Sequence, residues 1–488
     1  MSMSPEEFRR YGYQAIDWIA EYLANPQRYP VLPAIQPGEL TDRLPAAGPE
    51  CGEPMDHILR DFEGIIVPAV THWNHPGFLA YFANTAPPEG ILGELLAAAL
   101  NSNGMVWKTS PAVTELEQVT LSWLLRWLAL PEDWFGMIFD TASTSSLHAI
   151  AAAREALDPE SRKRGAAPGL TVYASEQAHS SIEKAAVALG FGRQNMRYVP
   201  VDVDFRMKPD ALRDLIESDL AAGLRPCCVT ATIGTTSTTS VDPVPEIAAI
   251  CREYKIWLHV DAAYAGSAGV APEFRWALAG CEQADSFVMN PHKWLLTPLD
   301  CSVFYTSRPE ALRRAFSLVP YILRTEENPR AVNLMEYGVP LGRRFRALKL
   351  WFVMRSYGRE GVAAMIRKHV GLAQELAKKI DDHPGFERTA PTPFSTVCFR
   401  YRGTDEQNRR ILERVNASGE VFLSQTVLHD KVSLRVAIGN LGTGREHVER
   451  AWELVRKEAD CAVTAASTSE AASTASPPLN SAPSSSGE

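Results

Sequence analysis

The chain has 488 residues, of which 45% are hydrophobic, enough to bury the core of one large domain and one or two smaller ones. Its 49 Lys and Arg against 58 Asp and Glu give a net charge of −9, spread without long runs of one sign, which argues against nucleic acid or an anionic membrane as a partner. The eight cysteines form no CxxC pair, no secretory leader opens the chain, and no apolar run reaches the roughly 18 residues of a membrane span. We therefore expect a soluble, cytoplasmic protein with reduced cysteines.

The first 87 residues are predicted to form a helical segment outside the main core. Residues 4–7 form a capping box with proline at the first helical position, and apolar residues follow at helical spacing as far as residue 23. A connection rich in proline and glycine (29–54) and a second amphipathic helix (56–70) come next. Because the first helix has a wide apolar face to bury, we expect residues 1–87 to act as a dimerisation segment.

A loop of aromatic and polar residues follows between His72 and Thr85. Loops of this kind line small-molecule pockets, but they also pack between domains, and the sequence leaves both interpretations open. His72 and His75 do not predict a metal site, because their spacing in a loop with Pro and Gly comes with no acidic or thiol companion. We expect no metal.

From residue 137 onward, short apolar strands alternate with helices. This pattern predicts an α/β fold with a mostly parallel sheet covered by helices on both faces, in a large domain that spans residues 88–350. Residues 351–461 predict a smaller α+β domain. Its expected elements are strands at 397–401, 421–423 and 432–438 and a helix at 446–458. Residues 462–488 contain almost no large apolar side chain, so we expect a disordered tail.

Small hydroxyl residues gather where the first strand of this sheet, 137–139, meets its helix. Asp140 is followed by Thr141, Ala142, Ser143, Thr144, Ser145 and Ser146. Hydroxyl groups and free backbone N–H groups at a helix N-terminus bind anions, most simply a phosphate. Ordinary N-capping would need only one hydroxyl, so the sequence favours a phosphate site.

Three further residues stand where strands end. His179 lies at a strand-to-helix turn, where capping or packing would explain it equally well. Asp261 ends the apolar strand 256–260 and needs a cationic or N–H partner, because an unpaired buried carboxylate is costly. Lys293 follows the apolar run 286–289; burial there would favour its uncharged, nucleophilic amine, although a lysine that extends its head into water is the alternative.

One ligand accounts for all four features. Pyridoxal 5′-phosphate has a phosphate, a pyridine nitrogen that needs an anionic partner to stay protonated, a ring face that a flat side chain can cover, and an aldehyde that condenses with a lysine amine. The sequence therefore predicts a pyridoxal phosphate site built from the phosphate-binding turn, Asp261, His179 and Lys293.

Four motifs resemble those of the group II pyridoxal-phosphate-dependent decarboxylases, closest to the aromatic-L-amino-acid decarboxylases. They are Thr114-Glu115-Leu116-Glu117, His259-Val260-Asp261-Ala262-Ala263-Tyr264, Asn290-Pro291-His292-Lys293-Trp294 and Leu341-Gly342-Arg343-Arg344-Phe345-Arg346. The resemblance runs from about residue 4 to residue 460. It implies the type I fold of these enzymes, with a seven-stranded sheet, and an obligate homodimer whose active site lies at the subunit boundary.

The resemblance also implies roles for individual residues. Lys293 would hold the cofactor aldehyde, Asp261 its pyridine nitrogen, and His179 and Ala263 its two ring faces. The remaining contacts implied are Thr236 near the ring, and Thr141, Ala142, Ser143, Asn290 and His292 around the phosphate. The implied reaction is loss of CO2 from an L-amino acid, followed by protonation at Cα.

The product of the reaction depends on the residue that delivers this proton. In the family it is thought to be a tyrosine on a mobile lid of the partner subunit, and the long segment 318–340 has the character of a lid. The matching position here is Ile322, with Tyr321 one residue earlier. We expect Tyr321 to serve and an amine to be released. The alternative is an aldehyde synthase, in which oxygen takes the electrons and an aldehyde leaves.

The predicted substrate pocket is aromatic. Its residues are Trp73, Tyr81, Phe82, Asn103 and Met105. Asn103 and Met105 stand where the animal enzymes of the family are more apolar or aromatic. The pocket suits phenylalanine, tyrosine, tryptophan or a hydroxylated relative, and the sequence does not rank them.

Overall fold

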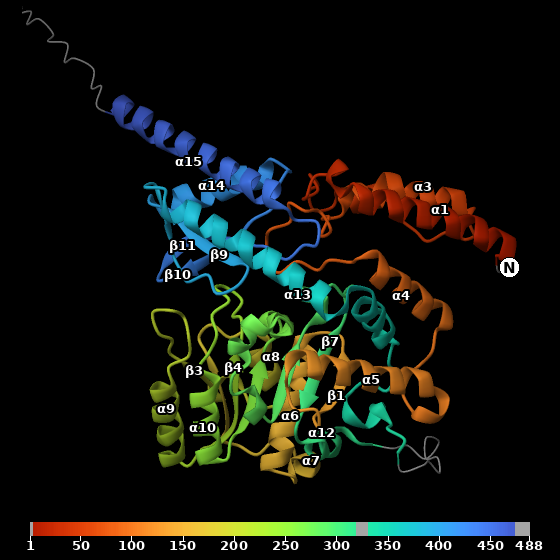
Figure 1. Cartoon of the computed structure of the whole chain (residues 1–488), viewed down its shortest axis with the longest axis vertical. Coiled ribbons are helices and arrows are strands. Elements are labelled where there is room, and N and C mark those ends of the chain that lie inside the picture. Colours follow the sequence, from red (N-terminus) through yellow and green to blue (C-terminus); the bar gives the residue numbers. More distant parts are fainter. Residues whose placement is uncertain (1–2, 319–329, 474–488) are drawn as a thin grey trace, which may run out of the picture.

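A seven-stranded sheet forms the centre of the large domain in the computed structural model, which describes residues 3–318 and 330–473. The strands lie in the order β1-β7-β6-β5-β4-β2-β3, and Figure 1 shows β3 and β4 on one side of the sheet and β7 and β1 on the other. Their bounds are β1 Phe135–Phe139, β2 Leu170–Ser175, β3 Met196–Val199, β4 Arg225–Thr232, β5 Trp257–Asp261, β6 Ser286–Met289 and β7 Ser302–Thr306. Only β7 runs antiparallel to its neighbours, so the predicted mostly parallel sheet is confirmed.

Helices cover both faces of this sheet and bury its apolar side chains in two separate cores. Helices α6, α8 and α12 pack on one face, and α5, α9 and α10 pack on the other. The helices of the large domain are α4 Pro88–Leu100, α5 Pro111–Leu128, α6 Ala142–Leu157, α7 Ser161–Arg164, α8 Ser181–Ala188, α9 Pro209–Ala221, α10 Val244–Tyr254, α11 Pro291–Trp294 and α12 Pro309–Phe316. The C-terminal ends of β1, β2, β4, β5 and β6 therefore lie along one edge of the sheet.

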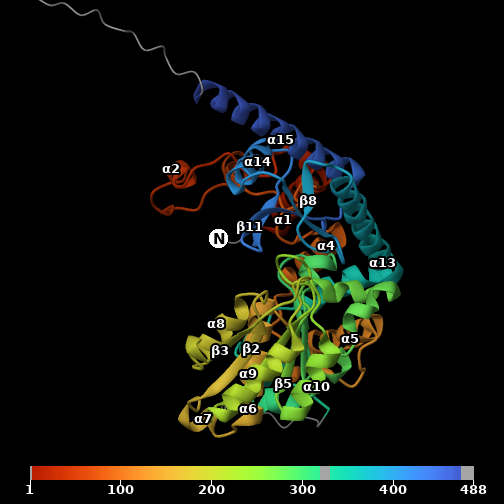
Figure 2. The same cartoon turned by 90° about the vertical axis from the view of Figure 1, so that its left-hand side faces the viewer.

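The small domain is an antiparallel sheet in the order β10-β11-β9-β8, packed against helices. Its elements are α13 Arg346–Asp381, β8 Phe386–Arg388, β9 Thr396–Tyr401, α14 Asp405–Ala417, β10 Ser424–Leu428, β11 Lys431–Ala437 and α15 Arg445–Ser473. Gly358 has a positive φ of 60° and divides α13 in two. Helix α13 runs from the large domain into the small one (Figure 2).

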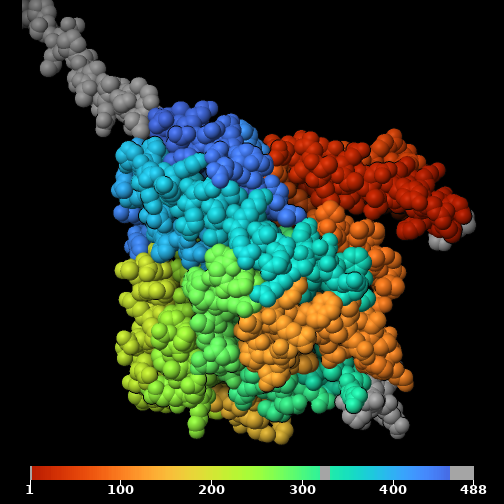
Figure 3. Space-filling view, in the orientation of Figure 1, coloured from red at the N-terminus to blue at the C-terminus, as the bar shows by residue number. Residues whose placement is uncertain are grey.

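The N-terminal segment stands out from the body of the molecule (Figure 3). It contains α1 Pro5–Ala24, α2 Glu39–Arg43 and α3 Met55–Asp61. The predicted capping box at Ser4 and Glu7 is present, and no residue of α1 is buried. The second predicted helix is shorter than expected, because π-helical and 3₁₀ turns continue from Phe62 to Ala69 after α3 ends.

Two predictions about the C-terminal part were wrong. The strand expected at 421–423 lies at Ser424–Leu428, because Phe422 forms an isolated bridge with Phe78 instead. Helix α15 continues to Ser473, so the predicted start of a disordered tail at residue 462 falls within a helix. Among the residues that the structure describes, no helix has both the length and the apolar character needed to cross a bilayer.

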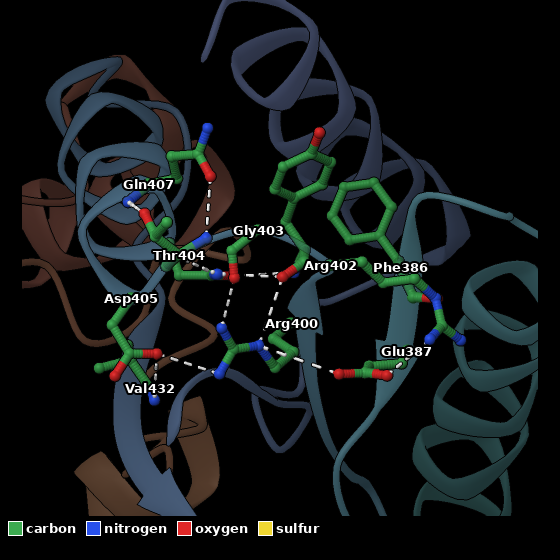
Figure 4. A network of polar contacts seen from close by, with 11 residues as sticks. Phe386, Glu387, Arg400, Arg402, Gly403, Thr404, Asp405, Gln407 and Val432 are labelled. Atoms are coloured by element: carbon green, nitrogen blue, oxygen red, sulfur yellow. Dashed lines mark hydrogen bonds and ion pairs between the residues drawn. The ribbon is translucent and has the colours of Figure 1, made fainter. Parts of the chain in front are cut away.

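A buried arginine ties the small domain together (Figure 4). The Arg400 side chain, 5% exposed, donates to the Asp405 carboxylate at 3.0 Å and to the Gly403 carbonyl at 2.7 Å. Asp405 also accepts from the backbone N–H of Val432 at 3.1 Å. Arg400 thus links β9, the start of α14 and β11 through hydrogen bonds that an apolar side chain could not make.

We predict that Arg400→Met destabilises the protein by roughly 2–3 kcal/mol, because Asp405 and the Gly403 carbonyl lose a charged donor. Arg409→Met is the matched control, since the ion pair of Arg409 with Glu406 is exposed on both sides and contributes about 0–1 kcal/mol. Urea unfolding of both variants measures the difference. Equal midpoints would contradict the role given to Arg400.

Candidate functional site

Lys293 lies in the short helix α11, directly after β6 and at the end of that strand. Its Nζ lies 5.1 Å from the centre of the Phe82 ring. That ring stacks on Tyr264 at 3.8 Å, and Tyr264 stacks on Trp294 at 4.8 Å. Lys293 therefore meets an aromatic stack rather than open water, and the alternative of a lysine head extended into solvent does not describe it.

The surroundings of Lys293 favour its uncharged form. Burial lowers the pKa of Lys293, the charge of Arg435 lowers it further, and the carboxylate of Asp261 acts in the opposite direction. Asp261 ends β5, is 4% exposed, and accepts a hydrogen bond from the backbone N–H of Ala263 at 3.1 Å. An amine, a carboxylate and a guanidinium thus influence one another at this edge of the sheet.

The predicted phosphate-binding turn forms the start of α6, with Thr141 in the N-cap position. The Thr141 side chain makes no capping hydrogen bond, so ordinary N-capping does not account for its hydroxyl. Ser143 is exposed, and it lines a cavity of about 500 Å³ together with Asp140, Arg343 and Arg344. The first N–H groups of α6 therefore remain available to an anion.

Asn290 and His292 supply two more polar groups beside Lys293. The Oδ1 atom of the buried Asn290 side chain has no hydrogen-bond partner among the described residues. His292 Nδ1 accepts the backbone N–H of Cys301 at 2.9 Å, and burial lowers the pKa of His292 to about 3. A neutral His292 then carries its proton on Nε2, where it can donate. These groups fit a bound phosphate.

His179 lies just before α8, where the charges of Asp261 and Lys293 act on its ring. Its Nδ1 accepts the backbone N–H of Ser181 at 3.2 Å, so His179 also acts as a helix cap. The capping role that the sequence left open for this histidine is therefore present. Thr236 is exposed in the loop after β4, next to Ser237.

Arg435, on β11 of the small domain, is a residue that the sequence interpretation missed. It is 4% exposed, and its side chain donates to the carbonyls of Ser237 at 2.9 Å and Tyr81 at 2.5 Å. Its Cζ lies 4.7 Å from the centre of the Phe82 ring, and its Nη2 has no partner among the described residues. The available signal was a charged residue inside the apolar run 432–438, which a buried strand tolerates only for a partner.

The structure divides the predicted substrate pocket into two groups. Trp73 and Tyr81 stack at 6.3 Å, and Phe82 lies under Lys293. The other two residues contact the segment 333–343 instead. Asn103 Oδ1 accepts the backbone N–H of Arg343 at 2.9 Å, and the Met105 carbonyl accepts the N–H of Met335 at 3.1 Å. Tyr321 and Ile322 lie outside the described residues.

We expected no metal at His72 and His75. Each of these side chains makes a hydrogen bond to another group of the protein. His72 Nδ1 lies 3.1 Å from the Tyr22 hydroxyl, and His75 Nδ1 accepts the N–H of Gly77 at 2.9 Å. Within residues 3–318 and 330–473, no group of three or more His, Cys, Asp and Glu side chains is arranged to hold a metal ion.

Comparisons with known proteins agree with this geometry. The family model described as the pyridoxal-dependent decarboxylase conserved domain matches residues 37–402. Aromatic-L-amino-acid decarboxylase of Mus musculus is 41% identical over 468 residues, 92% of this chain and 97% of that protein. Phenylacetaldehyde synthase of Arabidopsis thaliana is 40% identical over 474 residues, 94% of this chain and 96% of that protein.

A solved structure extends the likeness to three dimensions. The crystal structure of Oryza sativa TDC with PLP and tryptamine superposes with a TM-score of 0.92 at 37% identity, and covers 94% of this chain and 99% of its own. Sequence, fold and site therefore agree. The chain belongs to the pyridoxal-dependent decarboxylase family, and its cofactor is pyridoxal 5′-phosphate.

Proposed function

We propose that this enzyme removes the carboxyl group of an aromatic L-amino acid and releases the amine and CO2. The observation that carries the proposal is the meeting of Lys293 and Arg435 over the Phe82 ring, at 5.1 Å and 4.7 Å. The unpartnered Nη2 of Arg435 suits the substrate carboxylate, and the aromatic side chains suit an aromatic ring. An aromatic amino acid has both groups, and the mouse relative is named for that substrate class.

The residues around Lys293 divide the work of holding the cofactor. When bound, pyridoxal phosphate supplies an electron sink for the pair left behind when CO2 departs. We assign Lys293 to its aldehyde, Asp261 to its ring nitrogen, His179 and Ala263 to its two faces, and Thr236 to the edge of the ring. We assign the phosphate to Thr141, Ala142, Ser143, Asn290 and His292. Arg435 holds the substrate carboxylate.

Release of an aldehyde is the second candidate. It is motivated by Ile322, at the position where the family has a tyrosine, and by the 40% identity to a phenylacetaldehyde synthase. The two products differ in their oxygen demand. An aldehyde requires O2 and is accompanied by ammonia and peroxide, whereas an amine requires no oxygen.

We predict that Lys293→Ala loses the visible absorption of covalently held cofactor and at least roughly 10³-fold in activity, because the amine assigned to the aldehyde is removed. The exposed lysine variant Lys378→Ala is the control. With the wild-type enzyme, amine, aldehyde, CO2 and oxygen uptake are measured together on phenylalanine, tyrosine and tryptophan. Absorption that survives in Lys293→Ala would refute the assignment, and oxygen uptake equal to CO2 release would favour the aldehyde.

For Arg435→Met we predict a fall in kcat/KM of about tenfold to a hundredfold, because the substrate carboxylate loses a charged donor. Arg435→Lys should recover part of this loss, since it restores the charge without the forked geometry. The control is Arg402→Met, an exposed arginine of the same domain. Steady-state kinetics on cofactor-saturated enzyme measure the change, and an unaltered kcat/KM in Arg435→Met would rule out this role.

We also propose that two copies of the chain form a dimer with shared active sites. Helix α1 buries none of its residues within one copy, and Phe8 and Tyr13 are 68% and 65% exposed. Exposed apolar faces of this extent are typical of interfaces. A shared site would also explain why Asn103 and Met105 contact the segment 333–343 of their own chain while Trp73, Tyr81 and Phe82 lie with Lys293. The six buried free cysteines support a reducing compartment, which fits the cytoplasm.

A mixing experiment tests the shared site. Lys293→Ala removes the lysine of one site, and Met105→Glu places a charge in the loop that we assign to the partner's site. Each variant should be inactive alone, and co-expression should restore about a quarter of wild-type activity, because half of the dimers then contain one intact site. The control is a chain that carries both substitutions and is expressed without the single variants. A dimer by light scattering without recovered activity would contradict the shared site.

A further inference from the structure

The ring of His179 occupies the place of a capping group at the start of α8. Ser180 is the N-cap residue of this helix, and its side chain makes no capping hydrogen bond. Instead, the backbone N–H of Ser181 donates to His179 Nδ1 at 3.2 Å, and Ser181 Oγ lies 2.9 Å from the same nitrogen. A backbone N–H can only donate, so Nδ1 must present its lone pair.

We propose that Ser181 holds His179 as the neutral tautomer with its proton on Nε2, so that the ring serves the active site as an oriented hydrogen-bond donor. Ser181 is then a positioning residue that acts through His179. The Ser181 hydroxyl, which is 2% exposed, donates to the same lone pair and fixes the plane of the ring. The inference rests on the proposed function for the role of the ring at the site, but the tautomer follows from the hydrogen bonds alone.

Charges from three elements decide whether this ring can take a second proton. Asp261, at the end of β5, favours the charged ring, whereas Lys293 in α11 and Lys184 in α8 oppose it. Burial acts with the two lysines, and the pKa of His179 is lowered overall. The N-terminus of α8 adds positive potential at the ring. A second proton on Nδ1 would also face the Ser181 N–H directly.

A further consequence concerns the chemistry available to His179. A neutral ring with its proton on Nε2 donates one hydrogen bond toward the site and accepts none there. It can therefore orient a carbonyl or carboxylate oxygen, but it can neither give up its single proton without becoming an imidazolate nor take up a second one while Nδ1 remains in the cap. The function of the ring at the site is fixed by a contact on its opposite side.

The tautomer is measured by NMR on the holoenzyme labelled with ¹³C,¹⁵N-histidine. His179→Asn, which removes one set of signals, assigns the resonances of His179. We expect a neutral ring protonated on Nε2 at about pH 7, because the pKa of His179 is lowered from its ordinary value. A ring protonated on Nδ1, or doubly protonated at pH 7, would overturn the proposal.

Kinetics test the positioning role of Ser181. In Ser181→Ala we expect kcat to fall about threefold to tenfold, because one of two bonds to Nδ1 is lost, while KM and the cofactor absorption stay unchanged. Ser181→Thr, which keeps the hydroxyl, should restore kcat. Ser180→Ala is the matched control, because its hydroxyl makes no capping bond.

Equal kcat values in Ser181→Ala and Ser180→Ala would show that the hydroxyl does not position the ring. A parallel loss of bound cofactor and thermal stability would show a structural role only, and would also count against the proposal. If the wild-type enzyme released no CO2 from any aromatic amino acid, the proposed function would fail, whereas the tautomer seen by NMR would be unaffected. The two proposals therefore fail separately.

Discussion

Burial of the Lys293 amine beside a second cation is the constraint on which the rest of the site depends. Lys293 and Arg435 lie over one phenyl ring, so each loses water and each repels the other. The arrangement persists because the backbone holds both stems: Lys293 within the turn after β6, and Arg435 through the carbonyls of Ser237 and Tyr81. Burial is the largest cause of the lowered pKa of Lys293, and the charge of Arg435 adds to it against the opposing charge of Asp261.

This arrangement requires three parts of the chain to meet. Phe82 comes from the N-terminal segment, Lys293 from the large domain and Arg435 from the small one. The indole N–H of Trp294 donates to His369 Nδ1 at 3.0 Å, and His369 Nε2 lies 3.0 Å from the Asn440 carbonyl. Asn440 in turn donates to the carbonyl of Trp73 at 2.9 Å. The residue after Lys293 is thus connected through α13 and the small domain back to the aromatic loop.

The sequence allowed prediction of what depends on local order along the chain. The strand pattern placed Asp261 and Lys293 at strand ends, because alternation and apolar runs show where each strand stops. Arg435 escaped this reasoning, since its position depends on how two domains pack. The run 421–423 was mistaken for a strand because its apolar residues bridge to Phe78 rather than joining the sheet. Helix α15 extends beyond its apolar pattern, because adding a residue to an existing helix costs far less free energy than starting a helix.

The two histidines of the site are held by the same kind of hydrogen bond. His292 and His179 each turn Nδ1 toward a backbone N–H, that of Cys301 in one case and that of Ser181 in the other. In a neutral ring this leaves the proton on Nε2, so each presents a donor without a charge. That suits a site that already contains Lys293 and Arg435, because a further cation beside them would be repelled. Backbone N–H groups do not titrate, so they keep both rings in this state as the charges around them change during the reaction.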